Sequence, residues 1–324
     1  MKIAIVEGDG IGHEVIPVAR DVLAAVRPEY EFFQVEVGFG RWERTGHAIT
    51  EDDIALLATA DSILFGAVTT PPFPDYKSVV LQIRKALDLY ANVRPVSGKG
   101  VDLVIVRENT EGLYSGIETI EPDRATTLRV ITRRGAERIA RYACGIARER
   151  RHLTVGHKAN VLKSDVFFRD ICLHEAGIAG VPYKECFIDA LCLDVLRRPD
   201  AYDVIVTTNL FGDILSDVAA YLVGGLGMLP SANIGDHHAL FEPVHGSAPD
   251  IAGQDRANPI AAIRSAALLL RHIGECSAAE LVEAAITETL SSGVRTRDIG
   301  GTAGTKAFGQ TVIRMLGKMH RSMP

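Results

Sequence analysis

Two aspartates in residues 203–227 have the spacing that metal binding needs. The segment DVIVTT at 203–208 predicts a buried strand, and the apolar residues that follow recur at helical spacing. Asp213 and Asp217 therefore share one helix face and repel each other unless a positive charge lies between them. Mg²⁺ or Mn²⁺ would suit their oxygens. Alternatively, the aspartates simply face the positive end of the helix dipole, which explains Asp213 better than Asp217.

Three arginines lie at the ends of other predicted elements. Arg84 belongs to a short predicted helix, whereas Arg94 and Arg107 end apolar segments that are predicted to be buried strands. A guanidinium group binds a carboxylate through two parallel hydrogen bonds, so converging arginines would form a pocket for a di- or tricarboxylate. The alternative is that each arginine has a local capping or pairing role, which applies less well to Arg94 and Arg107.

Three further polar residues are candidates for the same chemistry. Tyr114 lies in the polar segment 107–118 and is either a surface aromatic residue or a proton donor. Lys158 follows the predicted strand 153–156; such a lysine is usually solvated, but one held against a pocket can act as a general base. Asp189 lies between apolar neighbours, and a buried carboxylate needs a partner, so it is a candidate third metal ligand.

A long polar loop at residues 241–253 precedes a predicted apolar helix at 259–272. Loops of this length are often functional. Its backbone and hydroxyl groups could surround a nucleotide, with Asp250 accepting hydrogen bonds from a ribose diol. A carboxylate in that place would repel a 2′-phosphate, so the loop favours NAD over NADP.

The glycines at positions 8, 10 and 12 lie between a predicted strand at 2–6 and a predicted helix. The dinucleotide-binding fingerprint requires the spacing G-x-G-x-x-G, which these glycines do not have. We therefore predict a tight turn with a close backbone approach rather than a Rossmann phosphate site.

The remaining elements predict an α/β fold, because strands and helices alternate with short turns. Strands are expected at 30–37 and 62–68, a capping box at 50–53 opens a helix, and another helix is expected at 135–148. Residues 125–131 are predicted to form a hairpin arm, and the link at 96–100 is a candidate domain crossing. The length of 324 residues predicts two domains.

Composition excludes several classes of partner. The net charge of −6 gives no general attraction to nucleic acid or anionic membranes, and the arginine-rich segment 133–151 is predicted to be a solvated helix face. No apolar run has the length of a membrane span or of a signal-peptide core. The five cysteines are scattered and lack metal-binding spacing, which predicts free thiols and a cytoplasmic location.

Six ordered segments resemble the β-decarboxylating dehydrogenases that act on isocitrate, homoisocitrate and 3-isopropylmalate. The segments are EGDGIG at 7–12, LDLYANVRP at 87–95, VRENTEGLY at 106–114, HKANVL at 157–162, NLFGDILSD at 209–217 and HGSAPDIAG at 245–253. The resemblance implies an α/β, two-domain isocitrate/isopropylmalate dehydrogenase-like fold rather than a Rossmann fold. One domain would comprise 1–96 and 225–324, and the other 97–224 with the dimer arm.

The resemblance also implies roles for individual residues. Tyr114 and Lys158 match the catalytic acid and base, and the metal ligands for Mg²⁺ or Mn²⁺ would be Asp189, Asp213 and Asp217. Substrate-binding positions would be Ser78, Arg84, Arg94 and Arg107, and NAD-binding positions would be Thr69, His245, Gly246, Ser247, Asp250, Ile251 and Asn258. In such enzymes Lys158 and Asp189 would act in the neighbouring subunit's site, so a homodimer is the minimum unit, with a tetramer as the alternative.

The implied reaction is the NAD-dependent oxidation and decarboxylation of a 3-substituted malate. Ser78 followed by Val80 resembles some homoisocitrate enzymes, which would give 2-oxoadipate for lysine biosynthesis. The segment YSGIE at 114–118 instead resembles NAD-dependent isocitrate enzymes, and Lys77 with Ser78 disfavours isopropylmalate, which ranks third. A catalytically silent regulatory subunit is a competing hypothesis, which the retention of Tyr114 and Lys158 opposes.

Overall fold

The computed structural model describes residues 1–73, 75–98 and 100–322 and contains two compact units. Unit 1 comprises Met1–Leu87, Gly224–Ala232 and Asp236–Pro324, and unit 2 comprises Asp88–Val223 with Asn233–Gly235. The chain thus leaves unit 1 after Leu87, whereas the sequence placed the boundary after residue 96. The expected link at 96–100 instead lies at a hairpin turn, in which Gly98 pairs with Val101; residue 99 is outside the described residues.

Unit 1 contains parallel strands that deliver their loops to one edge of a sheet. The strand order is β2-β1-β3-β12-β11, and β1 pairs in parallel with both β2 and β3. The register aligns Ile3 with Phe32 on one side and with Ser62 on the other. The strands are β1 (Lys2–Val6), β2 (Glu31–Gln34), β3 (Ser62–Phe65), β12 (Ala239–Pro243) and β11 (Pro230–Ile234), whose last residues belong to unit 2.

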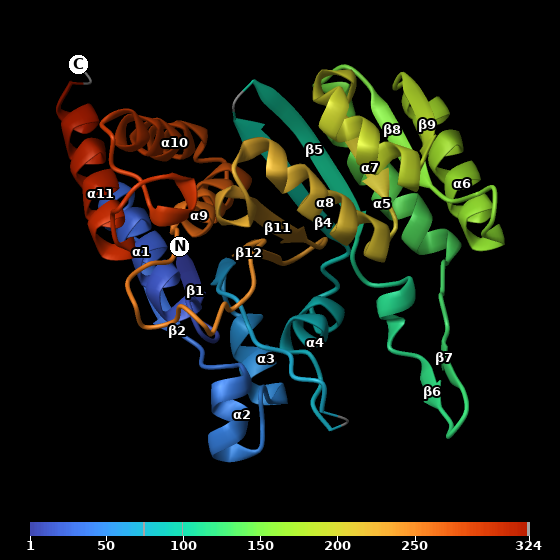
Figure 1. Cartoon of the computed structure of the whole chain (residues 1–324), viewed down its shortest axis with the longest axis horizontal. Coiled ribbons are helices and arrows are strands. Elements are labelled where there is room, and N and C mark those ends of the chain that lie inside the picture. Colours follow the sequence, from blue (N-terminus) through green and yellow to red (C-terminus); the bar gives the residue numbers. More distant parts are fainter. Residues whose placement is uncertain (74, 99, 323–324) are drawn as a thin grey trace. The chain divides into compact units, whose positions relative to one another are not determined.

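Apolar helix faces cover this sheet. The long helices α1, α9, α10 and α11 pack against one another, as Figure 1 shows. The capping box predicted at 50–53 is confirmed, because Thr50 accepts from the Asp53 amide and Asp53 accepts from the Thr50 amide. The helices are α1 (Gly12–Val26), α2 (Phe39–Thr45), α3 (Glu51–Leu57), α4 (Val79–Ala86), α9 (Ile260–His272), α10 (Cys276–Ser291) and α11 (Thr305–Ser322).

Unit 2 has its own run of strands in the order β4-β5-β10-β8-β9. β4 and β5 form an antiparallel hairpin, and β5, β10, β8 and β9 then run parallel to their neighbours. The strands are β4 (Ala91–Gly98), β5 (Val101–Glu108), β8 (Leu153–His157), β9 (Tyr183–Phe187) and β10 (Val204–Thr207). The central strands β8 and β10 are buried along their whole length, as their apolar sequences require.

The helices of unit 2 pack in pairs, α5 with α6 and α7 with α8. A separate two-stranded hairpin of exposed residues is formed by β6 (Glu118–Ile120) and β7 (Ala125–Thr127), and only β7 lies within the arm predicted at 125–131 (Figure 1). The helices are α5 (Arg133–Arg148), α6 (Lys163–Ala179), α7 (Ile188–Arg197) and α8 (Asn209–Val223).

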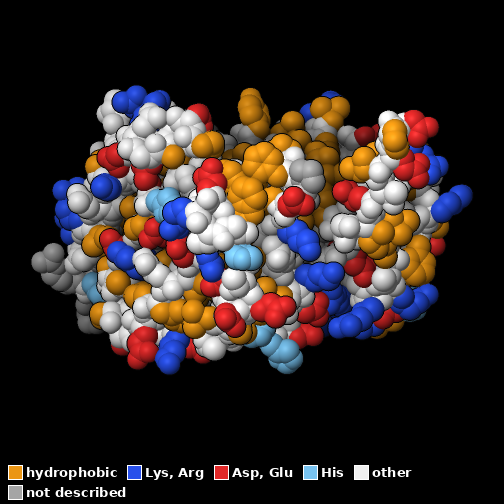
Figure 2. All heavy atoms as spheres, turned by 90° about the horizontal axis from the view of Figure 1, so that it is seen from below, with side chains coloured by type: hydrophobic (Ala, Val, Ile, Leu, Met, Phe, Trp, Pro, Cys, Tyr) orange, Lys and Arg blue, Asp and Glu red, His pale blue; other side chains and the backbone are white. Residues whose placement is uncertain are grey.

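Basic side chains are frequent on the surface of unit 2. Arg133, Arg134 and Arg141 of α5 are at least 61% exposed. Figure 2 shows one face of the molecule with Lys and Arg side chains gathered toward its right-hand end. Glu137 pairs with Arg133 and Arg141, one helical turn away on either side. Part of the arginine-rich segment thus forms a solvated helix face, as predicted. The prediction is wrong for Arg138 and Arg150, whose side chains are only 18% and 23% exposed and pair with Asp88 and Asp203.

The mixed arrangement of strands and helices confirms the predicted α/β class. All five cysteines have free thiols, as their scattered positions suggested. Within the described residues, every helix is too short or too polar to cross a membrane.

Candidate functional site

Candidate site residues follow the parallel strands of unit 2 at their carboxyl ends. Arg107 is near the end of β5, Lys158 comes directly after β8, and Asp189 lies in the first turn of α7, which follows β9. Helix α8, which carries Asp213 and Asp217, follows β10. Because these strands run parallel, their carboxyl ends share one edge, where ligands bind in open α/β sheets.

Two buried arginines meet the carboxylate of Asp213. Arg107 Nη1 donates to Asp213 Oδ1 at 2.5 Å, and Arg94 Nη2 donates to the same oxygen at 3.1 Å. Arg107 Nη2 also donates to Asn209 Oδ1 at 2.7 Å, and Arg94 Nη1 donates to Ser216 Oγ at 2.5 Å. Both guanidinium groups are therefore fixed in orientation, as bidentate binding of an anion requires.

Asp213 and Asp217 share a face of α8, as their spacing predicted, and Arg94 lies beside both. Arg94 Nη1 is 3.8 Å from Asp217 Oδ1. Burial raises the pKa of Asp217, and although Arg94 opposes this shift, the charge of Asp213 adds to it. The Asp213 and Asp217 side chains remain 34% and 56% exposed, so their outer oxygens can still reach an ion.

Tyr114 joins this cluster from a short 3-10 turn, Leu113–Ser115. Its hydroxyl donates to Asp213 Oδ2 at 3.1 Å, and the Arg107 guanidinium carbon lies 5.6 Å from its ring centroid. Burial and the negative charge of Asp213 raise the pKa of Tyr114. The phenol thus keeps its proton at neutral pH, as a proton donor must.

Lys158 and Asp189 form a second group in unit 2. Lys158 Nζ is 2.7 Å from Asp189 Oδ1 and 5.9 Å from the ring centroid of Phe187. The hydrogen bond from Lys158 lowers the pKa of Asp189. The Asp189 side chain is 65% exposed, so the expectation of a buried carboxylate is wrong, whereas the Lys158 side chain is only 26% exposed.

The carboxylates suit a hard divalent cation, but one chain supplies only part of such a site. Asp213 and Asp217 present oxygens from one helix face, whereas Asp189 is paired with Lys158. Across the described residues, no three Asp, Glu, His or Cys side chains meet in an arrangement that could hold a metal ion. Asp213 and Asp217 present oxygens of the type that such an ion prefers.

In unit 1, the predicted substrate residue Arg84 has a buried acidic partner. Arg84 Nη2 donates to Glu242 Oε1 at 2.9 Å, and the two side chains are 8% and 12% exposed. Arg84 Nε is buried and has no protein hydrogen-bond partner. Ser78, at the amino end of α4, is half-buried, and its hydroxyl makes no capping hydrogen bond within that helix.

The glycine turn after β1 makes the close backbone approach that the sequence predicted. A Cβ atom on Gly8 would lie 2.2 Å from the Ala67 carbonyl oxygen, and one on Gly10 would lie 2.0 Å from the Ser247 carbonyl oxygen. Both glycines have positive φ, 76° and 59°. Only glycine permits this contact with this backbone geometry.

The Asp9 carboxylate ties the same turn to two other loops of unit 1. It accepts from the amides of Phe39, Gly40 and Thr69 at 2.8, 2.9 and 2.8 Å. The Thr69 hydroxyl lies 2.7 Å from the Ser247 hydroxyl. Two predicted cofactor residues, Thr69 and Ser247, are therefore brought together by a network that the sequence did not reveal.

The other predicted cofactor residues differ in exposure and in hydrogen bonding. His245 Nε2 is buried without a protein partner, and burial lowers the pKa of His245, so the ring is neutral at neutral pH. Gly246 and Asp250 are exposed, and Ile251 is half-buried. Asn258 is 7% exposed; its amide donates to Asp298 at 2.8 Å and its oxygen accepts from the Ile260 amide at 2.9 Å. The orphaned nitrogen of His245 fits a ligand with its own hydrogen-bonding groups.

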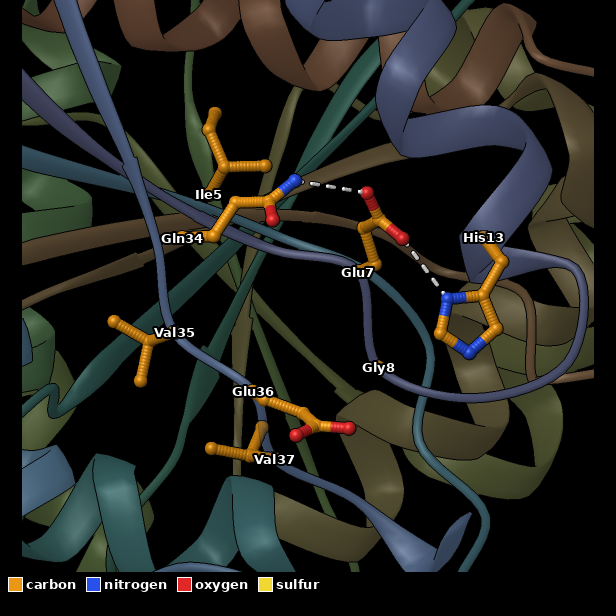
Figure 3. Close-up of a pocket in the computed structure, with 8 residues that line it drawn as sticks. All are labelled: Ile5, Glu7, Gly8, His13, Gln34, Val35, Glu36 and Val37. Carbon is orange, nitrogen blue, oxygen red and sulfur yellow. Dashed lines mark hydrogen bonds and ion pairs between the residues drawn. The ribbon is translucent and has the colours of Figure 1, made fainter. Parts of the chain in front are cut away.

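A cavity of about 260 Å³ opens at the carboxyl ends of β1 and β2, and the sequence did not single it out. Figure 3 shows Glu7 between two partners, His13 Nδ1 at 2.9 Å and Gln34 Nε2 at 3.3 Å. The other lining residues are Ile5, Gly8, Val35, Glu36 and Val37. Glu7 is thus satisfied by neighbouring side chains.

Several supporting residues escaped the sequence analysis. Asn209 and Ser216 orient the arginines, Glu242 holds Arg84, and Asp9 joins three loops. Asn209 and Ser216 were inside a recognised motif, and Asp9 was inside the glycine turn. The polar side chain of each residue within its motif was the signal that could have indicated its supporting role. Glu242 was inside the predicted polar loop at 241–253, but the sequence did not show its pairing, because its partner lies 158 residues away.

Comparison with known proteins gives a consistent result. The model of the isocitrate/isopropylmalate dehydrogenase family matches residues 2–312. The isocitrate/homoisocitrate dehydrogenase of Thermus thermophilus is 48% identical over 97% of this chain and 98% of its own length. The 3-isopropylmalate/3-methylmalate dehydrogenase of Methanocaldococcus jannaschii is 47% identical over 97% and 98%. The crystal structure of isocitrate dehydrogenase from Methylococcus capsulatus has a TM-score of 0.94 and 40% identity, covering 97% of this chain and 99% of that one.

Proposed function

Because the chain belongs to the isocitrate/isopropylmalate dehydrogenase family, we propose that it catalyses the NAD-dependent oxidative decarboxylation of a 3-substituted (R)-malate. The observation that carries this proposal is the cluster of Arg94, Arg107, Tyr114 and Asp213 in unit 2. Two fixed guanidinium groups and a retained phenol proton stand beside a carboxylate that can bind a cation. That combination suits a reaction in which negative charge develops on an acid substrate.

Each residue of the cluster then has a task. Arg94 and Arg107 bind the C1 carboxylate, and Lys158 accepts the C2 hydroxyl proton. Bound NAD⁺ would supply the acceptor for the hydride from C2. The resulting β-keto acid loses CO₂. Tyr114 then protonates C3, for which its raised pKa suits it, since it must hold its proton until that step.

A divalent cation completes the proposed site. Asp213 and Asp217 would hold Mg²⁺ or Mn²⁺ together with Asp189 of a second copy, and the ion would supply positive charge that stabilises the negative charge developing on the substrate. The Lys158 and Asp189 pair supports this sharing between subunits, because the Asp189 side chain is 65% exposed and can meet a second copy. A homodimer with two shared sites is the smallest assembly in which each site has the full set of residues.

NAD is the proposed cofactor, held by the loop group of unit 1. His245 Nε2 needs a hydrogen-bond partner, Thr69 and Ser247 present adjacent hydroxyls, and the exposed Asp250 can accept from a ribose diol. We expect Asp250→Ala to raise the KM for NAD⁺. The same carboxylate repels a 2′-phosphate, so turnover with NADP⁺ should be much slower than with NAD⁺.

Homoisocitrate is the proposed substrate, with isocitrate as the second choice and 3-isopropylmalate as the third. Ser78 offers a hydroxyl near the start of α4, and Val80 follows two residues later on the same short helix. The names of the relatives cover homoisocitrate, isocitrate and isopropylmalate, so the local residues decide the order. A hydroxyl suits the distal carboxylate of homoisocitrate or isocitrate better than it suits an isopropyl group.

The test is NADH formation by the purified chain with each of the three acids, using NAD⁺ and NADP⁺ side by side. We expect the highest kcat/KM with homoisocitrate and NAD⁺ in the presence of Mg²⁺ or Mn²⁺. A higher kcat/KM for isopropylmalate than for the other two acids would reject this substrate order. Absence of turnover with all three acids would favour the alternative of a silent regulatory subunit.

A further inference from the structure

Arg129, which lies between β7 and α5, is a largely buried arginine outside the proposed catalytic set. Its side chain is 14% exposed. Arg129 Nη1 donates to Ser164 Oγ at 2.8 Å, and Nη2 donates to Asp165 Oδ1 at 2.5 Å and to Thr208 Oγ1 at 3.1 Å. One guanidinium group therefore joins the segment after β8 to the segment after β10.

The first of these segments carries Lys158. Asp165 is completely buried, and its second oxygen, Oδ2, accepts from the Lys158 backbone amide at 2.6 Å. The amides of Val161 and Leu162 in turn donate to the Lys158 carbonyl at 3.0 and 2.9 Å. The Asp165 carboxylate thus fixes the backbone of the turn from which the Lys158 side chain extends.

The second segment is the start of α8. The Thr208 carbonyl accepts from the Gly212 amide at 2.9 Å, within the first helical turn. The Arg129 guanidinium carbon also lies 5.2 Å from the ring centroid of Phe211 in that turn. Arg129 is therefore held at the beginning of the helix that carries Asp213 and Asp217.

We propose that Arg129 and Asp165 are positioning residues that fix the Lys158 turn against the start of α8. This inference rests on the proposed function, in which Lys158 is the general base. Lys158 Nζ itself contacts Asp189 and the Phe187 ring. Arg129 and Asp165 therefore act through the backbone of the Lys158 turn and need not touch the substrate. The role of the clamp, meaning Arg129 with Asp165, is to place the amine where it can reach the hydroxyl proton.

The buried charges explain why an arginine is needed. A completely buried carboxylate without a cation is costly, and a lysine in place of Arg129 could neutralise Asp165. A lysine has no planar fork, however, so it cannot donate to Ser164, Asp165 and Thr208 in the same directions. Arg129→Lys therefore separates the charge of the clamp from its geometry.

The first experiment compares Arg129→Lys with the wild type on the substrate that wild type turns over. We expect kcat to fall by about 10²-fold, the scale of a misplacement of about 1 Å, while the substrate KM changes less than about threefold. Arg134→Met, at an 81% exposed position on α5, is the matched control and should keep the wild-type rate. A wild-type kcat for Arg129→Lys would overturn the clamp, whereas a wild type that turns over none of the acids would overturn the proposed function itself.

The second experiment separates positioning of Lys158 from a general structural role. The experiment uses a mixed dimer of two different chains, one with Lys158→Ala and the other with Arg107→Met. One of the two sites is then complete, because it takes Arg107 from the Lys158→Ala chain and Lys158 from the Arg107→Met chain. Activity of that site should fall strongly when Arg129→Lys is placed on the chain that supplies Lys158. The same change on the other chain should have a smaller effect.

The outcomes of the mixed dimers are decisive. Equal losses for the two placements would overturn the positioning role, because a structural defect would not depend on which half-site the chain supplies. If the mixed dimer without Arg129→Lys showed no activity, Lys158 would not act in the partner's site. That result would also overturn the stated role of the clamp. Thermal midpoints of each dimer confirm that folded proteins are compared.

Discussion

The candidate site residues of unit 2 and those of unit 1 are held by different forces. In unit 2, Arg94 and Arg107 converge on Asp213 through charged side chains, with both arginines buried. In unit 1, the glycine turn and the loops around it are joined largely through backbone groups, with Gly10 against Ser247 and the Asp9 carboxylate on three amides. The first arrangement depends on charge, and the second depends on the absence of side-chain volume.

This difference separates chemistry from shape. The charges of the buried guanidinium groups are already oriented before the substrate binds. Loss of these groups should therefore appear mainly as slower turnover. A turn built on glycine positions a loop by steric fit, so its disruption should appear mainly in stability and in cofactor binding. Each of the following changes tests one side of the comparison.

The largest effect is expected for Arg107→Met. It removes a buried guanidinium that binds Asp213 and Asn209, so kcat/KM should fall by about 10³-fold, or roughly 4 kcal/mol. Steady-state kinetics with the preferred acid measure this loss. The control Arg134→Met removes an arginine whose side chain is 81% exposed and should leave kcat/KM unchanged. A loss below tenfold for Arg107→Met would mean that the cluster does not bind the substrate.

Tyr114→Phe is expected to have the next largest effect. The change removes the hydroxyl that donates to Asp213 Oδ2 and keeps the ring beside Arg107, so kcat should fall by about 10²- to 10³-fold with little change in substrate affinity. Tyr183→Phe, at a 49% exposed position, is the matched control. If the KM rose while kcat stayed at the wild-type value, Tyr114 would be a binding residue rather than a proton donor.

The sequence predicted local geometry well because local geometry follows from spacing. The shared helix face of Asp213 and Asp217 and the capping box of Thr50 and Asp53 each depend on residues that are near in sequence, and the positive φ of Gly10 belongs to one residue. Patterns of this kind are visible without knowledge of the fold.

Long-range pairing was the part that the sequence did not reveal. Glu242 binds Arg84 across 158 residues, and Arg129 reaches Thr208 across 79. Such pairs depend on the order of parallel strands, which a single chain does not state. The same reason applies to the unit boundary, because the glycine-rich stretch near Gly98 suits a hairpin turn as well as a domain crossing.

Gly10→Ala tests the steric side of the comparison. The added Cβ would lie 2.0 Å from the Ser247 carbonyl oxygen, so the loop must move, and we expect a loss of about 3 kcal/mol in the free energy of unfolding with a higher KM for NAD⁺. Gly46→Ala is the matched control. Gly46 also has positive φ but has no atom within 4 Å of the added Cβ, so only the backbone cost of about 1–2 kcal/mol applies. Equal losses in urea unfolding would show that the contact with Ser247 is unimportant.

The smallest expected effect concerns His157, beside Lys158, at acidic pH. Burial lowers the pKa of His157, although Glu185 opposes this shift. His157 Nδ1 accepts from the Ala159 amide at 3.1 Å, which requires that nitrogen to be unprotonated. The unfolded state thus takes up a proton at a higher pH than the folded state does. The stabilising contribution is present above the unfolded pKa and is lost as pH falls through the folded pKa, by about 1.4 kcal/mol for each pKa unit between them.

The measurement is the free energy of unfolding in urea between pH 7.5 and 5. His157→Gln should flatten the acid limb of that curve, because the buried group that titrates is removed. His47→Gln, at an exposed position, is the matched control and should leave the limb in place. An acid limb of unchanged slope in His157→Gln would assign the loss of stability to other groups. His245 in unit 1, whose pKa is also lowered by burial, would then be the next residue to replace. A flatter acid limb in that variant would assign the acid sensitivity to the loops of unit 1 rather than to unit 2.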